Sequence, residues 1–304
     1  MIDDQLSSNG EVAGTEIAGL SAFDAALTEP RVPYTPILNL LWALATWLIS
    51  VACLFFIPLL VVLPYIVYLV MQRRMPTADL LGTDKSFLLL SILGVFPAHL
   101  LTFIVAWFIA TRKGQFRFWK VVAFEWPTRF RPRTTVAVST GLALLLLGIG
   151  GLITTYFGGP KTQLDQLIES SVQARVATAL LAVATGPFIE EVIYRGMLYP
   201  AIERVMGMAW AVAIVSIMFT GVHVLQYYNN LGVISVIALL SLTLTAVRAF
   251  TRSLIPSFLI HLIFNGVQSI ILLVQPLLEK TKEVAPKSTP AFEHLVQILR
   301  HLIV

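Results

Sequence analysis

Two adjacent glutamates and an arginine lie inside a long apolar stretch of the sequence. Glu190, Glu191 and Arg195 are three of only five charged residues in 176–247. A charge at the centre of a bilayer costs roughly 2.5–3.5 kcal/mol on insertion scales, so such residues are usually functional. Glu191 and Arg195 are four apart and can pair on one helical face. Glu190 points about 100° away and has no evident local partner.

An unpaired carboxylate in such a setting suits proton transfer. The alternative is that both glutamates are structural and are balanced by Arg195 and Arg204. The density of charge in an apolar region favours the functional interpretation.

Three later polar residues can meet Glu190. His223 lies in one apolar run, and His261 and Asn265 lie four apart in another. Counted from the turn at Gly207, Glu190 lies roughly 24 Å deep and His223 roughly 21 Å deep, at ~1.5 Å per residue. Counted from the opposite turn, Asn265 comes within several ångströms of the level of His223. The four side chains are therefore expected to form one site.

Such a site suits hydrolysis of an amide bond without a covalent intermediate. A glutamate and a histidine can polarise water directly. A second histidine and an amide can donate hydrogen bonds to an oxyanion. The apolar runs contain no serine or cysteine in a recognisable nucleophile motif, and the sequence has no His-Glu-x-x-His zinc helix.

The composition is that of a membrane protein. Of 304 residues, 57% are hydrophobic and 12% charged, whereas soluble domains carry about 25% charged residues. Several apolar runs exceed the ~20 residues that span a bilayer. We expect an all-α fold, a polytopic membrane helical bundle of about seven or eight transmembrane helices. The single cysteine, Cys53, excludes an intramolecular disulfide and a cysteine metal cluster.

Three regions are expected along the chain. Residues 1–36 hold six acids and one base and form an acidic flexible tail. The tail lacks a basic segment followed by an apolar core, so no cleavable signal peptide is expected. Residues 37–278 form the membrane domain, with a catalytic core at about 174–270. Residues 279–304 form a polar linker and an amphipathic C-terminal helix.

The apolar runs predict the individual spans. The first is one long helix kinked at its two prolines, and the second is kinked near Pro97. His99, beside that proline, is interpreted as a packed or locally bonded histidine. Residues 161–173 are expected to form a short surface helix. The seven expected spans are 37–71, 86–111, 134–157, 174–206, 208–226, 231–250 and 254–278.

The segment 112–133 is the most basic part of the chain. It holds seven basic residues and one acid, Glu125, with aromatic residues interleaved. Basic and aromatic residues together are compatible with nucleic-acid binding. Beside two membrane spans they favour a cytoplasmic segment that contacts anionic lipid headgroups. We therefore expect the bilayer as a partner, and no nucleic acid.

Three motifs follow one another in order on the fourth, fifth and seventh expected spans: Glu190-Glu191-x-x-x-Arg195, Phe219-x-x-x-His223 and His261-x-x-x-Asn265. Together they resemble the motifs of a known family, the CAAX prenyl protease type II family, also called the CPBP or abortive-infection membrane protease family. The resemblance covers about 174–270.

The resemblance implies a glutamate intramembrane peptidase of about eight helices. By that resemblance Glu190 and His223 would activate water, and His261 and Asn265 would line the oxyanion site. The remaining motif residues would support them: Glu191, Arg195 and Phe219. The resemblance favours water activation without a metal, so no cofactor is expected, although a Glu/His/His/Asn set could in principle hold Zn²⁺.

The resemblance also bounds partners and location. The implied substrate is a peptide or protein, which in some family members is prenylated. Other members serve in bacteriocin immunity, so a non-catalytic membrane binding or immunity protein is the alternative function, and a transporter is a further one. We expect an integral, multi-pass protein of a bacterial or archaeal plasma membrane.

Overall fold

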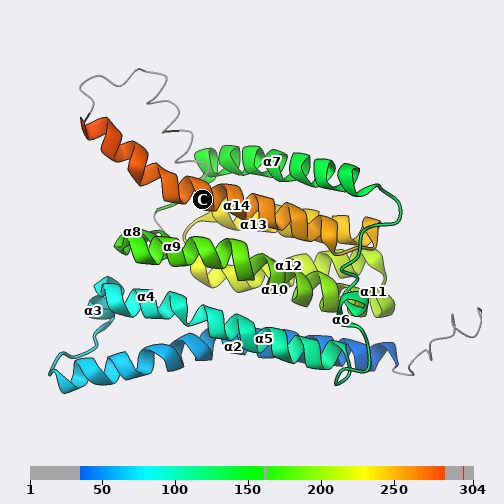
Figure 1. Ribbon diagram of the computed structural model, residues 1–304, viewed down its shortest axis with the longest axis horizontal. Coiled ribbons are helices and arrows are strands. Elements are labelled where there is room, and N and C mark those ends of the chain that lie inside the picture. Colours follow the sequence, from blue (N-terminus) through cyan, green and yellow to red (C-terminus); the bar gives the residue numbers. More distant parts are fainter. Residues whose placement is uncertain (1–34, 161–162, 285–296, 298–304) are drawn as a thin grey trace, which may run out of the picture.

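The computed structural model describes residues 35–160, 163–284 and 297 (Figure 1). The regular secondary structure of the described chain is helical, without any strand. The acidic tail, up to residue 34, and the amphipathic C-terminal helix lie outside the described residues. The last helix continues to Val284 and so includes the first residues of the expected polar linker.

Seven helical segments in the described part of the chain are long and apolar enough to cross a membrane. This confirms an all-α, polytopic, multi-pass membrane protein. The helices run side by side along one direction (Figure 1). The spans are α2 (Pro36–Met71), α4 (Lys85–Leu93) with α5 (Val95–Ala110), α7 (Pro132–Phe157), the composite span Val172–Met206, α12 (Met208–Tyr227), α13 (Leu231–Thr251) and the Ile255–Pro276 part of α14 (Ile255–Val284).

The second span breaks at Gly94, three residues before Pro97, near which the kink was expected. Gly94 separates α4 from α5. A Cβ atom on Gly94 would lie 2.6 Å from the Cα of Pro58 in α2. The glycine therefore allows the two spans to touch backbone to backbone, and Pro97 is accommodated within the first turn of α5.

Asp84 fixes the start of this span. Its carboxylate accepts hydrogen bonds from the backbone N–H groups of Ser86 and Phe87 and from the hydroxyl of Tyr65. Burial favours the neutral acid, but these hydrogen bonds and the charge of Arg74 outweigh it and hold the pKa of Asp84 below its ordinary value. Asp84 thus caps α4 and ties it to α2.

The composite fourth span is the most irregular element. It contains α9 (Val172–Leu180), a π-helical segment η1 (Leu181–Thr185), α10 (Gly186–Glu190), a second π-helical segment η2 (Glu191–Leu198) and α11 (Tyr199–Met206). The sequence predicts one span over 174–206 and does not reveal these π-helical segments. Because π-helical turns are rare and frequently occur at functional sites, they indicate that this span carries the functional site.

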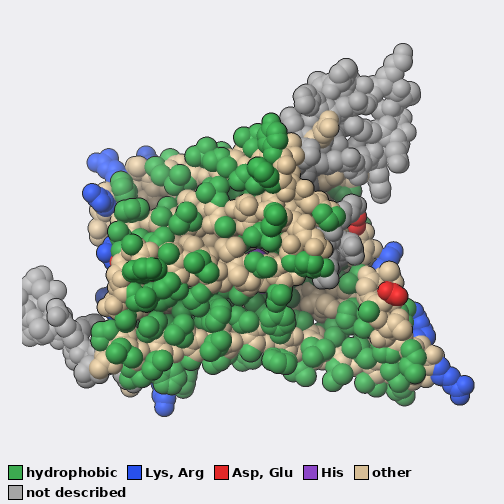
Figure 2. Space-filling model, turned by 180° about the vertical axis from the view of Figure 1, so that it is seen from behind, with side chains coloured by type: hydrophobic (Ala, Val, Ile, Leu, Met, Phe, Trp, Pro, Cys, Tyr) green, Lys and Arg blue, Asp and Glu red, His purple; other side chains and the backbone are tan. Residues whose placement is uncertain are grey.

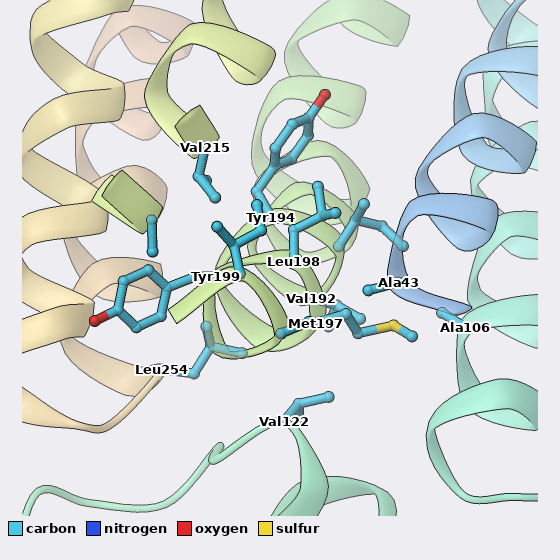
Figure 3. Packing of buried hydrophobic residues seen from close by; sticks show 14 of the residues in the cluster. Ala43, Ala106, Val122, Val192, Tyr194, Met197, Leu198, Tyr199, Val215 and Leu254 are labelled. Carbon is cyan, nitrogen blue, oxygen red and sulfur yellow. The ribbon is translucent and has the colours of Figure 1, made fainter. Parts of the chain in front are cut away.

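The largest buried cluster surrounds η2 and α11. In Figure 3, Leu198, Val192 and Met197 lie among side chains of other helices, with Ala43 of α2 and Ala106 of α5 to one side. Every residue of η2 is buried. The helix that carries the charged motif is therefore the centre of the bundle.

The basic segment after α5 folds back onto the end of the bundle. Its short helix α6 (Phe118–Val121) is followed by Val122, which is fully buried. A Cβ on Gly196 would lie 3.1 Å from the Cβ of Val122, and the Leu254 N–H donates a 2.8 Å hydrogen bond to the Ala123 carbonyl. The segment is thus part of the packed structure.

The outer surface is apolar, as a lipid-facing surface must be. Hydrophobic side chains cover the face shown in Figure 2, and Lys and Arg lie at its edges. The short helices α3 (Ala78–Thr83) and α8 (Gln163–Ser170) lie between spans, and α8 matches the expected surface helix. The hydrophobic band between charged edges fits the multi-pass assignment.

Candidate active site

The Glu191–Arg195 pair forms as the sequence predicts. Nη1 of Arg195 lies 3.0 Å from Oε1 of Glu191, and the two side chains are 0% and 1% exposed. Arg195 also donates to the Thr245 hydroxyl at 3.2 Å and to the Ser241 hydroxyl at 2.8 Å and carbonyl at 3.1 Å. Its guanidinium lies 4.6 Å from the centre of the Phe219 ring. The arginine is thus completely enclosed by partners from α12 and α13.

His261 connects both glutamates. Its Nδ1 lies 3.2 Å from Oε1 of Glu191, and its Nε2 lies 3.5 Å from Oε2 of Glu190. Glu190 has no partner on its own helix, as expected. Its partner is His261, which belongs to α14. A carboxylate flanks each ring nitrogen, so a proton on either nitrogen has an acceptor.

Glu190 and His223 both line the same cavity. The Glu190 side chain is 28% exposed, whereas Glu191 is enclosed. Nδ1 of His223 lies 2.8 Å from the Phe219 carbonyl. Because a carbonyl only accepts, Nδ1 carries the proton, and neutral His223 keeps its lone pair on Nε2. Phe219 thereby orients the basic nitrogen.

Phe219 is the packing centre of the site. Its ring lies 4.8 Å from the His223 ring, 6.0 Å from the His261 ring and 5.0 Å from the Tyr194 ring, measured between centroids. Tyr194 in turn accepts a 3.1 Å hydrogen bond from Nε1 of Trp47 in α2. A supporting role for Phe219 fits these contacts.

Asn265 has a partner that the sequence did not suggest. Its Nδ2 donates to the Ala182 carbonyl at 3.1 Å. One of the two amide N–H groups is therefore engaged with the backbone of η1, and one remains for another acceptor.

The four expected site residues line a single cavity of about 200 Å³. The matched-depth estimate is therefore correct. The cavity extends past Thr178 and Gln268 towards Tyr227 and α8. One wall is apolar: Val233, Val236, Ile237, Leu240, Phe264 and Leu272.

Several residues of the site escaped the sequence analysis. Ser241 and Thr245, which hold Arg195, are two polar residues four apart in an apolar span, and this spacing was a usable signal. His99 was interpreted only as a packed or locally bonded histidine. Its Nδ1 lies 2.8 Å from the Thr185 hydroxyl, 86 residues along the chain, so its partner is distant in sequence.

The side chains of the site include groups that can bind a metal ion, two histidines and a glutamate among them. Among the described residues, no three or more His, Cys, Asp or Glu side chains are arranged to hold a metal ion. The Nδ1 atoms of His223 and His261 are occupied by protein partners. Metal independence stays a prediction.

Comparison with protein families bears on the same region. Residues 172–267 match the family described as Rce1-like, type II CAAX prenyl endopeptidase Rce1-like. The resemblance is thus confirmed for this region. The match spans the composite helix, α12, α13 and the first part of α14, and so contains all seven motif residues. No curated protein and no solved structure matches the chain. At the level of the family, the match supports a CAAX-type intramembrane protease.

Proposed function

We propose that the protein is an intramembrane endopeptidase that hydrolyses a peptide bond with water activated by Glu190 and His223. The observation that carries the proposal is that Glu190, His223, His261 and Asn265, from three spans, line one cavity of about 200 Å³.

Glu190 and His223 act on the water. The Glu190 carboxylate is partly exposed to the cavity, and Nε2 of neutral His223 offers a lone pair. One of them accepts a proton as the water oxygen attacks the carbonyl carbon, and the same proton is delivered to the leaving amine when the C–N bond breaks. The products are a carboxylate and an amine, and no covalent enzyme intermediate forms.

His261 and Asn265 stabilise the tetrahedral intermediate. The remaining amide N–H of Asn265 and the Nε2–H of His261 donate to the oxyanion. His261 acts here as the imidazolium, which has two N–H groups, so Glu191 accepts from its Nδ1–H while its Nε2–H faces the oxyanion, and Arg195 holds Glu191 in place. Removal of one oxyanion donor in proteases costs on the order of 10²–10³ in kcat.

The substrate is a peptide segment that enters the membrane-embedded cavity. By the family match, lipidated proteins belong to the candidate substrates. Purified protein is to be incubated with prenylated and unprenylated peptide panels, and the peptidomes of cells with wild type and Glu190→Gln are to be compared. The expected result is cleavage that Glu190→Gln and His223→Ala abolish and chelators leave intact.

An exposed charge on the same span supplies the matched control. Arg204→Ala should cleave as wild type does, because Arg204 lies outside the cavity. Cleavage that survives Glu190→Gln would refute the assignment of the base. A cellular phenotype that Glu190→Gln retains, without cleavage of any peptide, would favour the binding or immunity function.

A further inference from the structure

In the turn before Glu190, one backbone carbonyl has no helical N–H donor, because the donor position is a proline. In η1 the backbone follows an i to i+5 pattern, in which the Gly186 N–H donates to the Leu181 carbonyl. The next donor in this pattern is residue 187, and its acceptor is the Ala182 carbonyl. Residue 187 is proline, which has no N–H to donate. The Ala182 carbonyl therefore needs a donor from elsewhere in the protein.

Asn265 supplies that donor. Its Nδ2 lies 3.1 Å from the Ala182 oxygen. Inside a membrane an unsatisfied carbonyl is costly, and side chains of neighbouring helices commonly satisfy the groups that prolines free. Asn265 is four residues after His261 on α14, so both side chains extend from one helical face. The helix that positions His261 thus also holds the turn that leads to Glu190.

A second side chain holds the same turn from the opposite side of the span. His99 of α5 is 7% exposed, and its Nδ1 lies 2.8 Å from Oγ1 of Thr185. Thr185 precedes α10, but its side chain makes no capping hydrogen bond to that helix. The hydroxyl is instead committed to His99. The turn Leu181–Thr185 is therefore fixed by α14 on one side and by α5 on the other.

We propose that Asn265 and His99 are positioning residues that hold the Pro187 break and thereby fix Glu190 against His261. Asn265 replaces the N–H that Pro187 lacks, and His99 anchors Thr185. This role is additional to the oxyanion contact proposed above and rests on that function only for its effect on cleavage. The Glu190–His261 contact is 3.5 Å, so a small movement of the turn breaks it. A displacement of about 1 Å at an active site can cost ~100-fold in rate.

A double-mutant cycle between residues 187 and 265 tests the first contact without any substrate. Asn265→Ala should lower the unfolding midpoint in detergent, because it strands the Ala182 carbonyl. Pro187→Ala returns a backbone N–H to this turn, so Asn265→Ala should cost less than about half as much in the Pro187→Ala background. Equal losses in both backgrounds would overturn the inference, and this readout is independent of whether the protein is a peptidase.

The same cycle in cleavage assays separates positioning from oxyanion stabilisation. Asn265→Ala should lower kcat more than it changes KM. Adding Pro187→Ala should raise kcat again by at least about tenfold, because misplacement of Glu190 can account for a loss of ~100-fold and the restored N–H should bring Glu190 back towards its position. No recovery would mean that the amide acts solely on the substrate and would overturn the positioning role for Asn265.

His99 and Thr185 form a second, separate cycle. His99→Leu and Thr185→Val should each lower kcat, and together they should cost no more than either alone, because both remove one contact. Thr185→Ser keeps the hydroxyl and should retain wild-type kcat. Additive losses, or a Thr185→Ser enzyme as slow as Thr185→Val, would overturn the role of His99.

Discussion

Replacing Arg195 by methionine should be the most destabilising single change in the charged motif. Arg195 is 0% exposed and makes four hydrogen bonds, one to Glu191 and three to Ser241 and Thr245. Methionine approximates its volume but has no charge and no donor. Glu191, itself 1% exposed, would lose its guanidinium partner and keep His261 at 3.2 Å.

The expected cost is about 3–5 kcal/mol, the range for breaking a buried ion pair by removing one partner. The structure places Arg195 at the upper end of that range. Its contact with the Phe219 ring at 4.6 Å adds about 0.5–2 kcal/mol when desolvated. Hydrogen bonds to a charged group contribute about 1.5–3 kcal/mol each, so the loss of the three bonds to Ser241 and Thr245 alone reaches the upper end of that range.

The measurement is reversible unfolding in mixed detergent micelles, read by tryptophan fluorescence. Arg204→Met is the matched control, because Arg204 is an exposed arginine nine residues later on the same span. Glu191→Gln combined with Arg195→Met should recover part of the loss, since the stranded charge is removed as well. An Arg195→Met loss no larger than that of Arg204→Met would refute the description of a desolvated pair.

The remaining predictions concern three other positions. Glu190→Gln should abolish cleavage yet cost less than about 1 kcal/mol of stability, because its carboxylate is partly exposed. The lowered pKa of Asp84 means that its charge stabilises the fold above about pH 4 and ceases to do so as pH falls through the folded-state value. The difference in unfolding midpoint between wild type and Asp84→Asn should therefore shrink on acidification, and a pH-independent difference would contradict it. Gly94→Ala should lower the unfolding midpoint and Gly148→Ala should not, because only the Gly94 Cβ would meet backbone; equal midpoints would contradict the close contact with α2.

The sequence predicted the site because its residues obey simple helical spacing. Glu191 and Arg195, like His261 and Asn265, are four apart, and such pairs share a face whether or not the helix is ideal. Depth counting brought Glu190 and His223 to one cavity because both lie on spans joined by a tight turn at Gly207, although the eight residues of η2 depart from the ideal α-helical rise. These are local properties that one sequence contains.

Contacts between distant helices could not be predicted in this way. The bond from Asn265 to Ala182 depends on which face of α14 meets the composite span, and His99 reaches Thr185 across 86 residues. The π-helical segments were also missed, because their i to i+5 bonds leave no distinct residue periodicity over five to eight residues. Pro187 signals a break in the helix, but nothing in the sequence indicates which side chain donates to the Ala182 carbonyl in place of the missing N–H.

The position of the cavity sharpens a conflict over the side from which substrate enters. The basic segment 112–133 holds seven Lys and Arg and packs through Val122 and Ala123 against Gly196 and Leu254. The positive-inside rule places this end in the cytoplasm. The cavity extends the other way, towards Ile168 and Tyr227. A cytosolic prenylated substrate would instead require the end with Ile168 and Tyr227 to face the cytosol.

Labelling of single cysteines with an impermeant reagent, in a Cys53→Ala background, decides between the two orientations. Lys120 and Tyr228 are both exposed and belong to opposite ends of the bundle, so Lys120→Cys and Tyr228→Cys should label from opposite faces. By the positive-inside rule, Lys120→Cys should be labelled from the cytoplasm. Ile168→Cys, at the cavity, and Tyr228→Cys should both be labelled from the outside. Labelling of Ile168→Cys and Lys120→Cys from one face would refute the cavity direction. Labelling of Tyr228→Cys from the cytoplasm and of Lys120→Cys from outside would show that the orientation predicted from the seven Lys and Arg residues is wrong. The cavity would then be accessible to cytosolic prenylated proteins.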